Sequence, residues 1–412
     1  MEFTRAEPGR EMMSRSMIRN PIKSRVLRIV VDARQVYRPQ RRGIGKTLIN
    51  LYTTLAVLRP HWQFQLIHQF DTSVPQLETY RNLGRTRIDF YGLNRYDLWE
   101  QVVLPIAALA ARADILHAPA NTGPKRSAVP VVVNIHDLIP LEMAPDAEET
   151  RVWLSRVKLV SERSRHILTG SEYSKRKLMD VLGTPAEKIT VNAWAPDKSV
   201  KRVEDPAIIG AVKARYGLRP EEPYLFAFGA SDPRKNTAGL MRAYAALPES
   251  LRREFRLLIV GIQDESLPEF RMLAAELRSG DQVKLCGFTP EVDIAPLLSG
   301  AAILCFASKY EGFGLPVLDA FLCGTPLLAG NRTSLPEVGG DAAHYIDPYD
   351  LDSIRHGLQT MLTDEGYRRR LSLRGLERSR LFTWERTAET VAGVFEAALT
   401  DAGGVGSCAS PC

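Results

Sequence analysis

Two charged segments in the C-terminal half contain the side chains best suited to chemistry. In the first, Arg234 and Lys235 lie between an expected strand and an expected helix. Arginine binds phosphate oxygens through its planar guanidinium fork, and lysine supplies a compact positive charge. A diphosphate that departs as a leaving group needs such neutralisation. The alternative is an ordinary charged loop with Asn236 as a helix cap, and this segment taken alone favours that alternative.

The second segment contains two acids that flank a glycine pair. Glu311 precedes Gly312 and Gly314, and Asp319 follows Glu311 by eight residues. The glycines allow a ligand to approach the backbone closely, and Asp319 would lie about two turns along the helix that follows them. Because a carboxylate only accepts hydrogen bonds, the two acids suit the hydroxyl groups of a sugar and a ribose.

The N-terminal half contains a glycine turn that partly matches a nucleotide-binding P-loop. Gly43 and Gly45 are followed by Lys46, but the full pattern requires a glycine where Gln40 stands. An ATPase is therefore not expected. What remains is a Gly-x-Gly turn that opens a helix, either a plain tight turn or a place where backbone amides approach an anion.

A histidine follows a predicted strand in the same half. His136 lies in an Ile-His-Asp-Leu segment directly after the apolar run at 129–135. A lone histidine at such a position is usually packed at a strand end. The neighbouring residues favour a functional role for His136 over that alternative.

Apolar runs alternate with helical patterns along the whole chain, which predicts parallel sheets with crossover helices. The expected strands are residues 26–31, 64–67, 115–118, 129–135, 167–169, 224–228, 257–260, 283–286, 303–306 and 326–329. A linker is expected at 196–206, between two α/β units. Ligands bind at the carboxyl ends of strands in open parallel sheets, so two such domains would hold two ligands opposite each other across a cleft.

Length and composition agree with two soluble domains. The chain has 412 residues, of which 45% are hydrophobic and 25% are charged. Such a length exceeds one ordinary core, and the balance excludes general disorder. No apolar run approaches a membrane-spanning length, and residues 1–25 lack a secretory pattern. These features predict a cytoplasmic protein.

The net charge of +6 is unevenly distributed. Residues 1–28 contain seven Lys/Arg against three Glu, and a second basic stretch covers 151–177. In that stretch Trp153, Leu154, Val157 and Val160 recur at helical spacing, as in an amphipathic helix with a cationic face. Such a helix either rests on an anionic membrane surface or packs normally, and normal packing is favoured. Nucleic acid is not an expected partner, because basic and aromatic residues do not alternate.

Residues 224–350 resemble the C-terminal domain of family 4 glycosyltransferases, which are retaining enzymes of the GT-B fold. The resemblance is carried by several motifs in order: Arg-Lys-Asn at 234–236, Gly287-Phe288, Glu-Gly-Phe-Gly-Leu-Pro at 311–316, Gly-Thr-Pro at 324–326 and Ser-Leu-Pro-Glu-Val at 334–338. The N-terminal half is similar in its Gly-Ile-Gly turn, its Ile-His-Asp-Leu segment and residues 169–175. Phe-Thr-Trp at 382–384 resembles the segment that opens the last helix of the family.

The resemblance implies two Rossmann-like domains that face a central cleft. The implied domains are an acceptor-side domain at 26–195, the linker at 196–206, a donor-binding domain at 207–383 and a helix at 384–400 that returns to the N-terminal domain. A basic disordered tail at 1–25 and a flexible tail at 401–412 lie outside the similarity.

Residue roles also follow from the resemblance. Glu311, His136 and Lys235 are the implied catalytic residues, with Glu311 on the transferred sugar and His136 near the sugar and the acceptor. The implied donor-binding residues are Gly43, Gly45, Arg234, Lys235, Gly287, Phe288, Glu311, Gly312, Phe313, Gly314, Leu315 and Asp319. Two positions depart from the family: Asp319 stands where a glutamate is usual, and Ala230 lies near the place where some members have an arginine.

The implied reaction is the transfer of a hexose-like sugar from a nucleoside-diphosphate sugar to a glycan or a lipid-linked acceptor, with retained anomeric configuration. The Ile-His-Asp-Leu-Ile-Pro segment is similar to bacterial members that add mannose, which favours GDP-mannose as donor in surface-polysaccharide or lipopolysaccharide synthesis. No metal and no cofactor beyond the donor are expected, since no Asp-x-Asp motif accompanies the donor loops. The alternatives are a catalytically degenerate binding subunit and a phosphorylase or epimerase of the same fold. Contact with an anionic membrane surface, through the basic tail or the stretch at 151–177, stays open.

Overall fold

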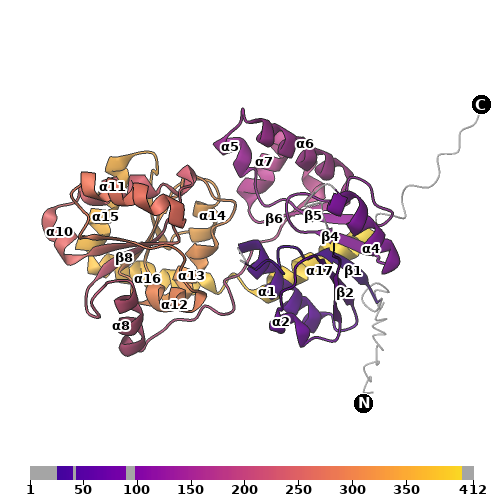
Figure 1. Ribbon diagram of the computed structural model, residues 1–412, viewed down its shortest axis with the longest axis horizontal. Coiled ribbons are helices and arrows are strands. Elements are labelled where there is room, and N and C mark those ends of the chain that lie inside the picture. The colour runs from indigo at the N-terminus through magenta and orange to yellow at the C-terminus, as the bar shows by residue number, and fades with distance from the viewer. Residues whose placement is uncertain (1–25, 40–42, 90–97, 401–412) are drawn as a thin grey trace, which may run out of the picture.

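The computed structural model of the protein describes residues 26–39, 43–89 and 98–400. These residues form two lobes, each built on one sheet with helices on its faces (Figure 1). The tails predicted at 1–25 and 401–412 lie outside the described residues, as does Gln40.

The N-terminal sheet has seven strands in the order β3-β2-β1-β4-β5-β6-β7, and the paired strands run parallel. The strands are β1 (Arg28–Asp32), β2 (Gln63–His68), β3 (Leu83–Arg87), β4 (Ile115–Ala118), β5 (Val131–Asn134), β6 (His166–Thr169) and β7 (Ile189–Val191). The helices are α1 (Gly43–Leu58), α2 (Pro75–Glu78), the π-helix η2 (Trp99–Val103), α4 (Leu104–Ala110), α5 (Ile139–Met143), α6 (Glu148–Arg163), the short η3 (Ala186–Lys188) and α7 (Glu172–Leu182). The strand order reverses between β1 and β4, where such sheets bind ligands.

The C-terminal sheet has six parallel strands in the order β10-β9-β8-β11-β12-β13. They are β8 (Tyr224–Phe228), β9 (Arg256–Val260), β10 (Val283–Leu285), β11 (Ile303–Phe306), β12 (Leu327–Gly330) and β13 (Ala343–Ile346). The helices are α8 (Pro206–Arg215), η4 (Pro233–Lys235), α9 (Thr237–Ala245), α10 (Glu249–Glu254), η5 (Asp264–Ser266), α11 (Leu267–Glu276), α12 (Glu291–Ser299), α13 (Leu315–Cys323), α14 (Leu335–Gly339), α15 (Leu351–Thr363) and α16 (Glu365–Ser379). The predicted pair of parallel-sheet domains is confirmed.

Three strands were not predicted, and all three lie at sheet edges. They are β3, β7 and β13. An edge strand buries less of its surface than a central one, so its sequence shows no continuous apolar run. The strand β3, whose sequence is LGRTR, has no fully buried residue at all. The central strands β4, β8 and β11 have the predicted bounds, because each is apolar and buried throughout or nearly so.

The last helix, α17 (Trp384–Thr400), returns to the N-terminal lobe and packs along α1 (Figure 1). Phe395 is fully buried there and lies 6.4 Å from the Trp62 ring, centroid to centroid. An Arg59–Glu389 ion pair of 2.6 Å ties the outer surface of α17 to the end of α1. The predicted crossover of the C-terminal helix is confirmed.

The basic helix α6 packs in the ordinary way. Val157 and Val160 are buried in the N-terminal core, and Trp153 and Leu154 pack against it. The structure therefore supports normal packing over a membrane-facing apolar side for this helix. Within the described residues, no helix combines the length and the apolar character that crossing a membrane would require.

Candidate active site

A cavity of about 520 Å³ lies between the two lobes, where the carboxyl ends of both sheets meet. The N-terminal domain contributes Gly43, Lys46, His136, Asp137 and Gly170 to its lining. The C-terminal domain contributes Arg234, Lys235, Glu311, Gly312, Phe313 and Asp319. Residues from distant parts of the chain thus share one space that has room for a nucleotide-sized ligand.

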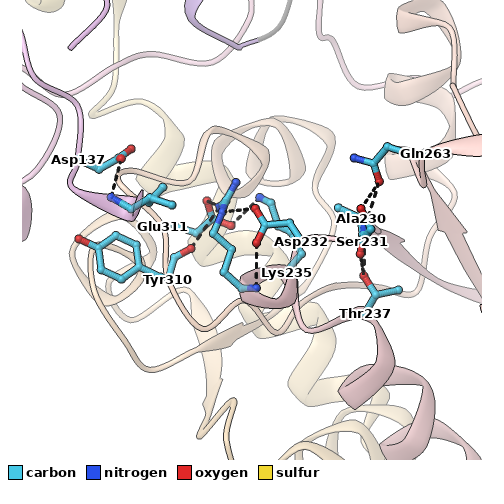
Figure 2. A network of polar contacts seen from close by, with 11 residues as sticks. Asp137, Ala230, Ser231, Asp232, Lys235, Thr237, Gln263, Tyr310 and Glu311 are labelled. Carbon is cyan, nitrogen blue, oxygen red and sulfur yellow. Dashed lines mark hydrogen bonds and ion pairs between the residues drawn. The ribbon is translucent and has the colours of Figure 1, made fainter. Parts of the chain in front are cut away.

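A buried carboxylate bridges two cations on the C-terminal wall. Lys235 Nζ lies 2.6 Å from Glu311 Oε1, and Arg234 Nη1 lies 3.1 Å from Glu311 Oε2. Arg234 Nε also contacts Asp232 Oδ2 at 2.7 Å. Figure 2 shows this cluster, with Asp232, Lys235 and Glu311 close together. The two cations predicted for a diphosphate and the acid predicted for a sugar therefore contact each other directly.

The loop after β8 contains Arg234 and Lys235, and we call it the cation loop. It is held in place by aspartate and asparagine side chains. Asp232 caps the short helix η4 by accepting the Arg234 N–H at 3.0 Å. Asn236 has a left-handed backbone, and its side chain donates to the carbonyls of Ala307 at 3.2 Å and Pro348 at 2.7 Å. Asn236 is the N-cap residue of α9, as the capping alternative expects, but its side chain makes no capping hydrogen bond to that helix. Through its two donated hydrogen bonds, the Asn236 side chain joins the loop after β8 to the residues that follow β11 and β13.

The glycine loop between β11 and α13 is held from both domains. The Ser334 hydroxyl donates to the Glu311 and Phe313 carbonyls, each at 2.9 Å. The Gly312 carbonyl accepts hydrogen bonds from Ser171 at 2.9 Å and Ser174 at 3.2 Å, both at the start of α7. The backbone that follows Glu311 is thus fixed by hydrogen bonds from either side of the cleft.

Both glycines of this loop are required by its geometry. Gly314 has φ 108°, a region that residues with a Cβ rarely adopt. A Cβ on Gly312 would lie 2.6 Å from Asp137 Oδ2, closer than carbon and oxygen can approach without a shift. Asp137, on the opposite wall, therefore touches the glycine loop directly.

Asp319 lies on α13, the helix that directly follows this loop. Its carboxylate accepts the Asp197 N–H at 3.3 Å, so it contacts the segment that joins the two domains. Burial raises the pKa of Asp319 to about 7. A polar ligand group that donates a hydrogen bond to this acid would stabilise the charged form.

On the N-terminal wall, His136 is oriented by hydrogen bonds to its ring and its backbone. His136 Nε2 donates to the Pro119 carbonyl at 2.9 Å, since a carbonyl can only accept. The backbone N–H of His136 donates to Asn121 Oδ1 at 2.7 Å. The centroid of the imidazole ring lies 5.7 Å from the centroid of the Trp194 ring. Burial lowers the pKa of His136, which favours the neutral ring with a lone pair on Nδ1. Burial also raises the pKa of its neighbour Asp137.

Comparison with known proteins identifies the family. Residues 41–192 match the family described as "Glycosyltransferase Family 4", and residues 210–378 match "Glycosyl transferases group 1". The chain is 30% identical over 370 residues to O-antigen chain mannosyltransferase B of Escherichia coli, a match covering 85% of this chain and 94% of that protein. The chain belongs to glycosyltransferase family 4.

Further relatives and solved structures agree with this assignment. A serotype-specific mannosyltransferase of Escherichia coli is 30% identical over 280 residues, which is 65% of this chain but 34% of that longer protein. Sucrose-phosphate synthase from Thermosynechococcus elongatus superposes with a TM-score of 0.72 at 19% identity, covering 91% of this chain and all of that one. An Anabaena protein solved with UDP and glucose superposes at 0.70 and 17% identity, over 90% and 100% of the two chains. The two superpositions establish the GT-B fold predicted from the motifs.

In this glycosyltransferase most of the predicted site residues line the one cavity. They are Gly43, His136, Arg234, Lys235, Glu311, Gly312, Phe313, Gly314, Leu315 and Asp319. Three predicted donor residues lie outside its lining. Gly45 is buried within the first turn of α1, Gly287 packs beside Asp264, and the Phe288 side chain is 84% exposed.

Several cavity residues of the glycosyltransferase were not among the predicted site residues. Asp137 directly follows His136 at the end of β5, so its position after a predicted strand was an available signal. Trp194, two residues before the predicted linker, also lines the cavity. Lys46 and Glu291 form an ion pair of 2.8 Å between the domains, and no sequence signal connects two residues so far apart.

Proposed function

We propose that this glycosyltransferase moves a hexose from a nucleoside-diphosphate sugar to a hydroxyl group of a glycan or lipid-linked acceptor, with retained configuration. The observation that carries the proposal is the Glu311 bridge to Arg234 and Lys235, opposite His136 in one cavity. Two cations suit the diphosphate, and a buried acid suits the sugar hydroxyls.

The bridge suggests how donor binding would change the site. Both cations form ion pairs with Glu311, and Arg234 also pairs with Asp232. A diphosphate that reaches Arg234 and Lys235 would take over these contacts, which frees Glu311 to accept hydrogen bonds from sugar hydroxyls. As the anomeric carbon separates from the diphosphate oxygen, charge builds up on the leaving group, and the two cations stabilise it most in the transition state.

In the proposed step, the acceptor oxygen bonds to the anomeric carbon on the face that the diphosphate leaves. The acceptor proton passes to a diphosphate oxygen. The neutral His136 would accept a hydrogen bond at Nδ1 and so orient a sugar or acceptor hydroxyl. Because the protein cations neutralise the diphosphate in this scheme, no metal is required, and turnover should persist in excess EDTA.

Mannose from GDP-mannose is the proposed donor group, in surface-polysaccharide or lipopolysaccharide synthesis. Two relatives that are 30% identical are named as an O-antigen chain mannosyltransferase and a serotype-specific mannosyltransferase. A nucleoside-diphosphate donor is further supported by the Anabaena neighbour, which was solved with UDP and with UDP-glucose.

A thermal-shift panel of GDP, UDP, ADP and dTDP sugars tests the donor. A ligand at about one hundred times its Kd adds about 2.7 kcal/mol to the free energy of unfolding. We expect the largest shift with GDP-mannose, its loss in Lys235→Ala, and no change in the exposed control Lys201→Ala. No shift with any nucleotide sugar would contradict the donor site. NMR of the transferred sugar then tests retention, and an inverted anomeric centre would contradict the proposed step.

A further inference from the structure

One residue beside Glu311 has a backbone conformation that its own side chain disfavours. Thr333 has φ 59°, which lies in the left-handed region. Within the described residues, the residues other than glycine that have a positive φ are Arg112, Asn121, Asn236, Arg278 and Thr333. Thr333 is the only β-branched residue among these five. A β-branched side chain is rarely found in this region, because its branch crowds the backbone there.

The other four residues have ordinary reasons for a positive φ. Arg112 and Arg278 lie two residues beyond the ends of α4 and α11, where a left-handed residue commonly ends a helix. Asn121 and Asn236 are asparagines, whose short polar side chains bond locally and tolerate the left-handed region. Thr333 lies between the end of β12 and the start of α14, so neither reason applies to it.

Hydrogen bonds from the glycine loop hold Thr333 in this conformation. Thr333 Oγ1 accepts the Glu311 N–H at 3.1 Å. The adjacent Ser334 is fully buried, and its hydroxyl donates to the Glu311 and Phe313 carbonyls. Consecutive side chains of an extended chain point to opposite sides, so two adjacent hydroxyls of a strand would not reach one loop. The left-handed turn at Thr333 lets both hydroxyls contact the Glu311 segment.

The chain is also anchored on both sides of Thr333. Before it, the Asn331 N–H donates to the Ile346 carbonyl at 2.8 Å. After it, Leu335 is buried against Gly314, where an added Cβ would lie 2.9 Å from Leu335 Cδ2. A disfavoured backbone conformation persists only where its surroundings impose it, and such residues gather at active sites. The fold therefore imposes strain at Thr333, and the hydrogen bond to Glu311 is what that strain provides.

We propose that Thr333 is a positioning residue that fixes Glu311 for sugar transfer. This inference rests on the proposed function, in which the Glu311 carboxylate passes from Arg234 and Lys235 to sugar hydroxyls. Thr333 and Ser334 hold the N–H and the carbonyl of Glu311, so the change requires only rotation of the Glu311 side chain. A fixed backbone keeps the carboxylate within reach of the cations and of the sugar, which preserves the geometry that the transition state needs.

Three substitutions at position 333 separate the hydrogen-bond acceptor from the strain. Thr333→Val keeps the shape and the β-branch but removes the acceptor. Thr333→Gly also removes the acceptor, and it relieves the strain because glycine adopts a positive φ freely. Thr333→Ser keeps the acceptor and loses one methyl group, so it is the conservative variant.

The acceptor should decide the rate, and the strain should decide the stability. We expect kcat to fall about tenfold or more in Thr333→Val and Thr333→Gly, with KM for the donor changed by less than about twofold. Thr333→Ser should restore kcat to within about twofold of the wild type. The Tm of Thr333→Gly should exceed that of Thr333→Val, because only the valine keeps a β-branch at positive φ.

A residue that merely supports the fold would give a different pattern, in which kcat falls in step with Tm across the three variants. That pattern would overturn the proposal. Thr363→Val is the matched control, since Thr363 is exposed at the end of α15 and its hydroxyl donates to the Gln359 carbonyl of its own helix at 2.9 Å. This variant should leave kcat and KM as in the wild type.

Coupling between Thr333 and Glu311 is tested in the Glu311→Gln background. Thr333→Val should there lower kcat by less than about twofold, because the carboxylate that Thr333 positions is already absent. Equal losses of kcat in the wild-type and Glu311→Gln backgrounds would show that Thr333 acts elsewhere, which would overturn the proposal.

A crystal structure of Thr333→Val provides a readout without sugar transfer. The Glu311 carboxylate should move from its place between Arg234 and Lys235, where it lies 2.6 Å from Lys235 Nζ (Figure 2). An unmoved carboxylate would overturn the proposal. A wild-type chain without transferase activity would contradict the proposed function instead, and the crystal structure would still decide whether Thr333 positions Glu311.

Discussion

The two walls of the cleft differ in charge and in origin. The C-terminal wall concentrates charge, with Glu311 between Arg234 and Lys235, and two short segments of the chain supply it. The N-terminal wall presents His136, glycine backbone and the Trp194 indole ring beside Lys46 and Asp137, drawn from segments that are far apart in sequence. Under the proposed function, this difference means that the C-terminal wall would neutralise the leaving group and the N-terminal wall would orient sugar and acceptor hydroxyls.

The walls also support each other at one side of the cleft. Ser171 and Ser174 bond the Gly312 carbonyl, and the Glu337 carboxylate accepts the N–H groups of Glu172 at 2.8 Å and Tyr173 at 3.3 Å. An acid at the amino end of a helix is favoured by the helix dipole. The C-terminal domain therefore caps α7, and α7 in turn holds the backbone next to Glu311.

The largest effect is expected on the charged wall. Glu311→Gln keeps the shape of the side chain but removes the carboxylate shared by Arg234 and Lys235, leaves Arg234 with Asp232 alone, and weakens the contacts proposed for the sugar. Turnover should fall by about 10²- to 10³-fold, as for the loss of one strong transition-state contact. Steady-state kinetics with saturating donor measures it. Asp232→Asn, a partly exposed neighbour in the same cluster, should lose much less, and a near-normal rate in Glu311→Gln would contradict the assignment.

The neutral wall should respond less. His136→Ala removes one oriented hydrogen bond, for which we expect roughly a tenfold loss of turnover. Donor affinity, measured by calorimetry, should stay within a factor of about two, because the diphosphate contacts lie on the other wall. His166→Ala, at the amino end of β6, is the control and should leave the rate unchanged. Equal losses in both histidine variants would show that the two walls are not distinct.

Contact between the walls can be tested at Gly312. Gly312→Ala places a methyl group against Asp137 and should lower turnover several-fold by displacing the loop that contains Glu311. Asp137→Gly makes room for that methyl group, so the double variant should lose less than the product of the two single losses. If the losses of turnover in Gly312→Ala and Asp137→Gly simply multiply in the double variant, the result would contradict a contact between these two residues. Gly393→Ala, with open space around its Cβ position, is the matched control.

The last expected effect concerns stability and not turnover. Burial raises the pKa of Asp319 to about 7, well above the usual range of an aspartate. The folded protein thus binds a proton that the unfolded chain releases, and this stabilisation is complete below about pH 4 and lost as the pH rises to about 7. Asp319→Asn abolishes the titration, so its Tm relative to wild type should increase between about pH 5 and pH 8. A constant difference in Tm would contradict an elevated pKa.

The sequence by itself determined the alternation of strands and helices and the segments of the charged wall. Central strands such as β8 are apolar throughout, and the cation loop and the glycine loop are short, contiguous motifs whose chemistry is local. These features could be predicted because a buried strand, a phosphate-binding cation and a flexible glycine each depend on residue type over a few positions. The edge strands escaped prediction because partial burial removes that local signal.

Only the tertiary structure decided which of these residues meet. The bridge from Glu311 to both cations, the contact of Asp137 with Gly312 and the Lys46–Glu291 pair join segments separated by 75 residues or more in the chain. The exposure of Val102, Ile106 and Leu109 on η2 and α4 was as undecided as the burial of the apolar face of α6, since an apolar helical pattern does not show which side packs in a core. Packing between distant segments settles such questions, because burial and proximity depend on the whole fold and not on the order of neighbouring residues.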